Sequence, residues 1–136
     1  MFYVDPDQLE LSDSWQDEDP TARWRSGPGH SPSSGAASSG SSLLEVDPGC
    51  RLPRHTDSAE EIVVVLSGRA EVEVGGERCV VNAGGLALVP KCVPHEVRNG
   101  GDDVLRFAAV YTEPDVVTSY ERPVQPDGSA DRHTIS

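Results

Sequence analysis

No run of apolar residues in this sequence approaches the roughly 20 that a membrane-spanning helix requires. The first residues, 1–6, also lack the basic flank and apolar core of a secretory signal. These two absences argue against a membrane partner and against export. We therefore expect the protein to be cytoplasmic.

Cysteine is also scarce. The three cysteines, Cys50, Cys79 and Cys92, are an odd number at spacings that match neither a disulfide framework nor a Cys-x-x-Cys zinc site. We expect three free thiols.

Basic residues are few compared with acidic ones. Lys and Arg together number 11 and Asp and Glu number 23, which gives a formal charge of −12. A field of that sign repels the phosphates of nucleic acids and the surface of anionic membranes. Nucleic acid is therefore not an expected partner.

A length of 136 residues suits a single domain. Residues 1–42 are first acidic and then rich in Gly, Ser and Pro, which predicts a flexible connector in the second half of the segment. The first half contains Trp15 and Trp24, and such large aromatic side chains favour an arm that packs on the domain. A poorly ordered leader is the alternative. From 43 to 113 short Val-, Leu- and Ile-rich runs alternate with Gly, Pro and Asn, which is typical of an all-β domain.

The strands of this domain follow from local patterns. Residues 69–74 alternate polar and apolar side chains, and Gly75 and Gly76 then supply the positive φ angles of a hairpin into residues 77–81. Further strands are expected over three later runs, 86–89, 95–99 and 104–111. About seven evenly spaced strands favour a β-sandwich or a β-barrel.

Two segments depart from this pattern. Residues 62–66 are apolar on both faces, so their outer face needs a cover, for which a homodimer partner is preferred over the N-terminal arm. Residues 114–136 contain Pro114, Pro123 and Pro126, which exclude a continuous helix and predict an extended strap that ends in a frayed tail.

Four polar residues at the ends of the predicted strands carry the chemistry. His55 and Asp57 are two residues apart and so project to the same side of an extended chain. Glu61 begins the next apolar run, and His95 opens a later strand after a Pro-containing turn. Two imidazoles and two carboxylates that converge inside a barrel predict a divalent metal site suited to Fe, Mn, Ni or Zn. The alternative is a set of polar groups that bond only to one another.

The spacing of these residues resembles that of the cupin superfamily. The first cupin motif, Gly-x5-His-x-His-x3-Glu-x6-Gly, and the second, Gly-x5-Pro-x-Gly-x2-His-x3-Asn, are matched without gaps by Gly49, His55, Glu61, Gly68, Gly84, Pro90, His95 and Asn99. Asp57 replaces the second His of the first motif, and Cys92 replaces the middle Gly of the second. The likeness implies an antiparallel jelly-roll β-barrel.

The resemblance also implies metal-ligand roles for His55, Glu61 and His95, with one divalent ion, Fe2+, Zn2+, Mn2+ or Ni2+, as the cofactor. The role of Asp57 stays open. As a ligand it completes a set of two His and two carboxylates, whereas as an outer residue it hydrogen-bonds to a ligand or to metal-bound water. The sequence His55-x-Asp57 with His95 also resembles the His-x-Asp…His triad of 2-oxoglutarate oxygenases. Such an enzyme needs a basic residue in the pocket to bind the carboxylate of its cosubstrate. The nearby candidate is Arg106, but strand parity predicts that it points outward.

The similarity to small cupins implies a metal-dependent enzyme that acts on a small organic molecule, as an oxygenase, cyclase, isomerase or lyase in a tailoring step of specialised metabolism. Two alternatives remain. One is a non-catalytic small-molecule binding or sensor module, and the other is an accessory partner of a biosynthetic enzyme. The sequence assigns neither the substrate nor a catalytic acid or base.

Overall fold

The computed structural model describes residues 1–135, and its regular elements are strands and two short 3-10 helices, η1 (Pro6–Gln8) and η2 (Pro32–Ser34). The strands are β1 (Ser12–Gln16), β2 (Asp19–Pro28), β3 (Gly40–Val46), β4 (Arg51–Asp57), β5 (Glu61–Ser67), β6 (Arg69–Val74), β7 (Glu77–Asn82), β8 (Leu86–Val89), β9 (His95–Asn99), β10 (Leu105–Tyr111), β11 (Val116–Val124) and β12 (Ser129–Ile135). Within residues 1–135 no helix has the length and apolar character needed to cross a membrane. The all-β prediction is confirmed.

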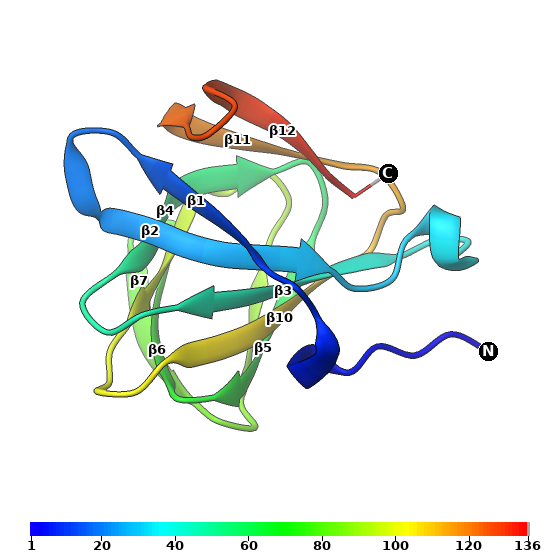
Figure 1. The fold of residues 1–136 in the computed structure, drawn as a ribbon, viewed down its shortest axis with the longest axis horizontal. Coiled ribbons are helices and arrows are strands. Elements are labelled where there is room, and N and C mark those ends of the chain that lie inside the picture. Colours follow the sequence, from blue (N-terminus) through cyan, green and yellow to red (C-terminus); the bar gives the residue numbers. More distant parts are fainter. Residues whose placement is uncertain (136) are drawn as a thin grey trace.

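The strands form a nearly closed barrel in the order β7-β6-β9-β4-β2-β3-β10-β5-β8 (Figure 1). The pairs are antiparallel except for a single parallel bridge between β2 and β4. Strands β7 and β8 lie at the two ends of this order and follow each other directly in the chain. The antiparallel barrel expected for residues 43–113 is therefore present, and further strands extend it at both ends of the sequence.

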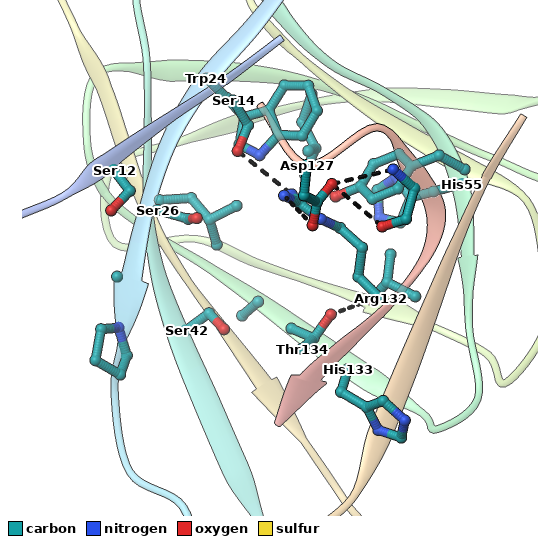
Figure 2. Close-up of a pocket in the computed structure, with 18 of the residues that line it drawn as sticks. Ser12, Ser14, Trp24, Ser26, Ser42, His55, Asp127, Arg132, His133 and Thr134 are labelled. Atoms are coloured by element: carbon teal, nitrogen blue, oxygen red, sulfur yellow. Dashed lines mark hydrogen bonds and ion pairs between the residues drawn. The ribbon is translucent and has the colours of Figure 1, made fainter. Parts of the chain in front are cut away.

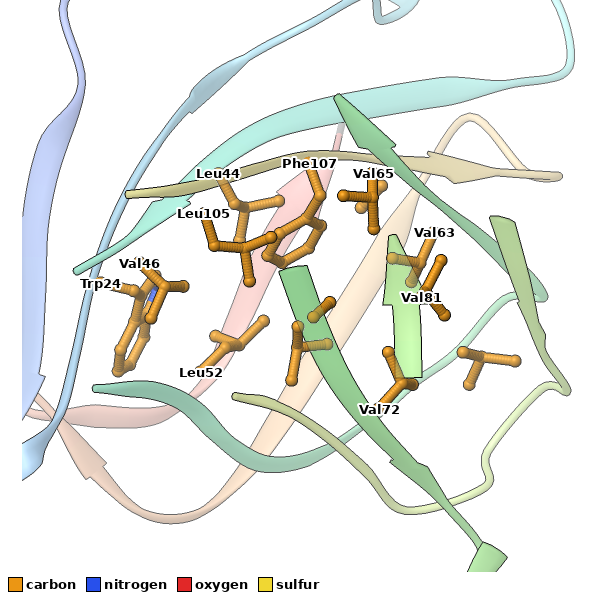
Figure 3. Packing of buried hydrophobic residues seen from close by; sticks show 14 of the residues in the cluster. Trp24, Leu44, Val46, Leu52, Val63, Val65, Val72, Val81, Leu105 and Phe107 are labelled. Carbon is orange, nitrogen blue, oxygen red and sulfur yellow. The ribbon is translucent and has the colours of Figure 1, made fainter. Parts of the chain in front are cut away.

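The barrel core comes from strict alternation along the strands. In β10, Leu105, Phe107, Ala109 and Tyr111 are buried, while the residues between them are partly exposed. Phe107 packs among Leu44, Val63 and Val65 from the neighbouring strands (Figure 3). Arg106 points outward, as predicted, and pairs with Glu45 and Asp7. These apolar side chains fill one part of the barrel and leave the polar side chains grouped in another.

The N-terminal segment differs from the expected arm and connector. It forms β1 and β2, and β2 pairs with β3 in register over residues 25–28. The inward positions of β2 are Ala22 and Trp24, which are 0% and 2% exposed and belong to the core. Because these side chains alternate with polar ones, the segment completes the sheet although its composition is acidic.

The C-terminal segment also differs from the expected frayed tail. It folds into the β11–β12 hairpin, which lies beside β4 at one end of the barrel (Figure 1). Val116 and Thr118 on β11 are buried. Pro123 falls where the pairing with β12 is interrupted between Ser119 and Val124, so the backbone donor that proline lacks is not needed there.

The outer face of β5 is apolar, as the sequence predicted. Ile62 and Val64 lie opposite Leu88 and Leu86 of β8. Leu86 and Leu88 are 65% and 56% exposed, so the described part of the chain does not cover this face. The homodimer that would bury it stays a prediction.

Candidate metal centre

The four candidate ligands are brought together by three strands. His55 and Asp57 lie at the end of β4, Glu61 is the first residue of β5, and His95 is the first residue of β9. His55 and His95 are paired in register between β4 and β9. Each of the four residues offers a ligand atom, and these atoms all lie within 4.8 Å of one another. All four side chains are buried, with residue exposures of 2–4%.

Hydrogen bonds to the backbone orient both imidazoles. Nδ1 of His55 lies 2.7 Å from the carbonyl oxygen of Pro53, and Nδ1 of His95 lies 2.9 Å from that of Val93. A carbonyl oxygen only accepts, so each Nδ1 carries the proton and donates. Both Nε2 atoms are thereby turned toward the carboxylates, which is how histidine ligands are commonly held by an outer hydrogen bond.

The carboxylate of Asp57 uses its two oxygens differently. Oδ1 accepts a hydrogen bond of 2.6 Å from Thr118 Oγ1. Oδ2 is fully buried and has no hydrogen-bond partner among residues 1–135. It lies 3.1 Å from His95 Nε2 and 3.7 Å from His55 Nε2, among the other candidate ligand atoms.

Burial and proximity shift the pKa values of the group. Burial lowers the pKa of His55 to about 4. Burial also raises the pKa of Glu61, to about 7. Burial opposes the charge on His95, but its contacts with the two carboxylates outweigh that effect and raise its pKa to about 10. The pKa of Asp57 is lowered to about 2 although burial raises it, because hydrogen bonding and charge from His95 and His55 outweigh the burial, so the two carboxylates of the cluster are shifted in opposite directions.

This donor set fits a divalent cation. Two imidazole nitrogens and two carboxylate oxygens suit Fe, Mn, Ni or Zn. The alternative of polar groups that satisfy one another leaves Asp57 Oδ2 buried without a partner, at a cost that a bound cation would remove. His55 Nε2, His95 Nε2, Glu61 and Asp57 Oδ2 are the groups that would hold it.

A pocket of about 710 Å³ leads from this cluster to the surface, with His55 and Glu61 in its lining (Figure 2). Tyr120 stacks on Trp24 at a centroid distance of 5.4 Å and lies 5.2 Å from the His55 ring. These rings form one wall of the pocket. Volumes of this size accommodate small organic molecules.

A guanidinium group lies within the pocket. Arg132 of β12 contacts Ser14 Oγ at 3.3 Å and Asp127 Oδ2 at 3.4 Å (Figure 2). Both contacts are long, so the group retains unused donors. Among the described residues that line this pocket, Arg132 alone is an Arg or Lys.

Three of these pocket residues, Thr118, Tyr120 and Arg132, were missed by the sequence reasoning, which placed them in a tail. The available signal was the run of β-branched and aromatic residues Val116, Val117, Thr118 and Tyr120, because such residues are enriched in strands.

The family-model comparison covers the part of the chain that contains all four candidate ligands. The model described as Cupin domain matches residues 42–111, more than half of the sequence. The chain belongs to the cupin family. In this cupin, strands β2, β11 and β12, which lie outside the matched range, supply Trp24, Tyr120 and Arg132 to the pocket.

Solved structures share the fold of this cupin. They include the Lactobacillus farciminis oxalate decarboxylase formate complex, with a TM-score of 0.66, 21% identity and coverage of 79% of this chain and 32% of that one. The Schizosaccharomyces pombe Cnp3 cupin domain has a TM-score of 0.64, 16% identity and coverage of 79% and 70%. The Bacillus subtilis oxalate decarboxylase at pH 4.6 has a TM-score of 0.60, 24% identity and coverage of 73% and 27%.

At these identities the similarity establishes the fold alone. The chain spans about a third or less of each decarboxylase chain. No curated protein matches the sequence.

Cys92 shows how this cupin departs from the second motif without losing its backbone. Its φ of 62° lies in the left-handed region that glycine favours. Its N–H donates a 2.9 Å hydrogen bond to the carbonyl oxygen of Asp57. The loop before His95 is therefore joined to β4 although a side chain replaces the glycine. The three cysteines are free, as expected, and Cys92 is exposed.

Proposed function

We propose that this cupin is a metal-dependent enzyme that acts on a small organic molecule, with one divalent ion at His55, Asp57, Glu61 and His95. The observation that carries the proposal is the convergence of four buried ligand atoms within 4.8 Å at the inner end of a pocket of about 710 Å³. The mutual distances suit a single ion. Buried ligands next to a substrate-sized cavity favour catalysis or binding over a purely structural metal.

A bound divalent ion supplies Lewis acidity, which polarises an oxygen donor of the substrate. The protein residues supply the rest. Backbone carbonyls hold His55 and His95 with Nε2 facing the site. The stacked rings of Trp24 and Tyr120 provide an apolar surface that excludes water from one side of a bound molecule. Two anionic ligands offset the charge of the ion and moderate its acidity, which favours substrate binding over strong activation of water.

Arg132 supports a substrate that carries a carboxylate or a similar anionic group. Its side chain is 24% exposed and its two contacts leave donors free, so a planar anion could be bound by two parallel hydrogen bonds. Such a molecule would bind the ion at one end and the guanidinium at the other. Small carboxylates, including the oxalate and formate named for the structural neighbours, are the first compounds to test.

The proposed reaction is of oxygenase, cyclase, isomerase or lyase type. The role in a tailoring step of specialised metabolism and the cytoplasmic location rest on the sequence resemblance and composition. The binding or sensor module and the accessory protein are outcomes that the following experiment separates from an enzyme.

The test begins with elemental analysis of natively purified protein, which should show close to one equivalent of a transition metal per chain. We then measure turnover of a panel of small carboxylates before and after chelation of the metal. The panel also includes metabolites of the pathway that the neighbouring genes encode. Activity that disappears with the metal and returns on reloading supports the enzyme. Ligand binding without turnover, which persists in His95→Ala, would overturn it in favour of a sensor.

A further inference from the structure

The Asp57 carboxylate is fixed by a strand outside the matched cupin range. Thr118 on β11 lies directly opposite Asp57 on β4 in the antiparallel register. Both residues are 3% exposed, and the Thr118 hydroxyl donates to Asp57 Oδ1 at 2.6 Å. This buried hydrogen bond occupies one carboxylate oxygen, Oδ1, and leaves the other, Oδ2, free to face the imidazoles.

The direction of the hydrogen bonds follows from the chemistry of the groups. In the 2.6 Å contact the Thr118 hydroxyl is the donor and Asp57 Oδ1 is the acceptor. The single hydroxyl proton of Thr118 is therefore donated to Asp57. The contact between the Thr118 and Thr134 hydroxyls therefore runs from Thr134, on β12, as donor to Thr118. The β11–β12 hairpin supplies an ordered chain of two hydroxyls that ends on Oδ1.

This arrangement decides where Oδ2 points. With Oδ1 occupied by Thr118, the buried and unpartnered Oδ2 is directed at His95 Nε2 and His55 Nε2, 3.1 Å and 3.7 Å away. Both imidazole nitrogens are themselves candidate ligand atoms, so Oδ2 lies among the ligand set rather than beside a group outside it. It has the position of a ligand atom.

We propose that Thr118 is a positioning residue that makes Asp57 a direct, monodentate metal ligand through Oδ2, with Thr134 as its supporting donor. The inference rests on the metal site of the proposed function and adds the C-terminal hairpin to it. Outer hydrogen bonds of this kind typically change metal affinity by about 10–100-fold. In this cupin the aspartate that replaces a histidine depends on a hydroxyl that the cupin-domain range does not contain.

The experiment measures Mn2+ binding to the full chain by calorimetry and by the electron paramagnetic resonance signal of free and bound Mn2+. Thr118→Val keeps the shape of the side chain but removes the hydroxyl, and it should raise the Kd about 10–100-fold. Thr118→Ser restores the hydroxyl and should bring the Kd back toward the wild-type value. Thr134→Val should give a smaller loss, because Thr118 still donates to Asp57.

Thr56→Val is the matched control. Thr56 precedes Asp57 on β4, where the alternation of the strand turns it away from the buried ligands, and the same substitution there should leave the Kd unchanged. Unchanged affinity in Thr118→Val overturns the positioning role while the metal site stands. An equal loss in Thr118→Val and Thr118→Ser also overturns it, because packing would then be the cause. A wild-type protein that binds neither Mn2+ nor Zn2+ overturns the proposed function itself.

If Thr118→Val is not folded by circular dichroism, Thr118→Ser and Thr134→Val decide the question. Two results together would contradict the proposal. In the first, Thr134→Val has the wild-type Kd and an unchanged Mn2+ spectrum. In the second, the Kd of Thr118→Ser rises as far as that of Asp57→Ala.

Discussion

His55 and His95 are paired across β4 and β9, and their ring centroids lie 4.1 Å apart. This pairing places two imidazoles from distant parts of the sequence side by side, with each Nδ1 held by a backbone carbonyl. The register of two strands therefore sets the nitrogen half of the candidate metal centre.

Replacement of either histidine should remove the metal. In His95→Ala one imidazole remains beside two carboxylates, so we expect the metal content by elemental analysis to fall from close to one equivalent to a small fraction of that. His55→Ala should behave in the same way. Cys79→Ser is the control, since the exposed Cys79 thiol lies outside the ligand cluster and its loss should leave metal content and activity unchanged.

Asp57→Ala distinguishes the two roles that the sequence left open for this residue. As a direct ligand, Asp57 contributes one of four protein donors, so its loss should weaken Mn2+ binding more than Thr118→Val does. The dissociation constants of the two variants provide the comparison. Full retention of metal with altered activity would instead assign Asp57 to an outer position.

Arg132→Gln should impair binding of an anionic substrate. Because hydrogen bonds to charged groups contribute about 1.5–3 kcal/mol, we expect KM for a carboxylate substrate to rise about 10–100-fold with unchanged metal content. Steady-state kinetics give the KM. Arg98→Gln, at an exposed outward position on β9, is the control. Equal kinetic constants for Arg132→Gln and wild type would count against an anionic substrate.

Stability should depend on pH at the Asp19–Arg51 contact. Hydrogen bonds from Thr21, together with a 2.6 Å bond from Arg51, lower the pKa of Asp19 from 3.8 to about 2. Because the pKa is lower in the folded state, the ionised carboxylate stabilises the fold above about pH 4, and this contribution is lost as the pH falls toward 2. Urea unfolding between about pH 4 and pH 2 should show that wild type is more stable than Asp19→Asn at the upper end. The difference between their free energies of unfolding should disappear as the pH falls. A constant difference would contradict the assignment.

Phe107→Ala should destabilise the barrel strongly. Phe107 is 0% exposed in the centre of the core, and such truncations cost about 3–5 kcal/mol in the free energy of unfolding. Urea or thermal unfolding of the metal-free protein measures this loss without the contribution of bound metal. Val104→Ala, at a residue that is 41% exposed, should change the free energy by far less. Similar losses at both positions would show that the core is not packed as described.

The barrel between residues 43 and 111 and its four candidate ligands could be predicted from the amino-acid sequence. These follow from local features: alternation along each strand, Gly and Pro at the turns, and the fixed spacing of His55, Asp57 and Glu61. His95 was added because it opens a later strand after a Pro-containing turn, and the resemblance to the cupin motifs relates it to the other three. Such patterns involve neighbours in the chain and can be seen without coordinates.

The strands at the two ends of the chain and the orientation of Asp57 could not be predicted in this way, because both depend on long-range contacts. The hydrogen bond between Thr118 and Asp57 joins residues 61 positions apart, and that between Arg132 and Ser14 joins residues 118 positions apart. No local pattern encodes such contacts, because they depend on which strand edge remains open for β11 once the barrel has formed. The acidic and proline-containing composition that suggested an arm and a tail is compatible with strands as soon as an inward face, such as Trp24 or Val116, has a core to enter.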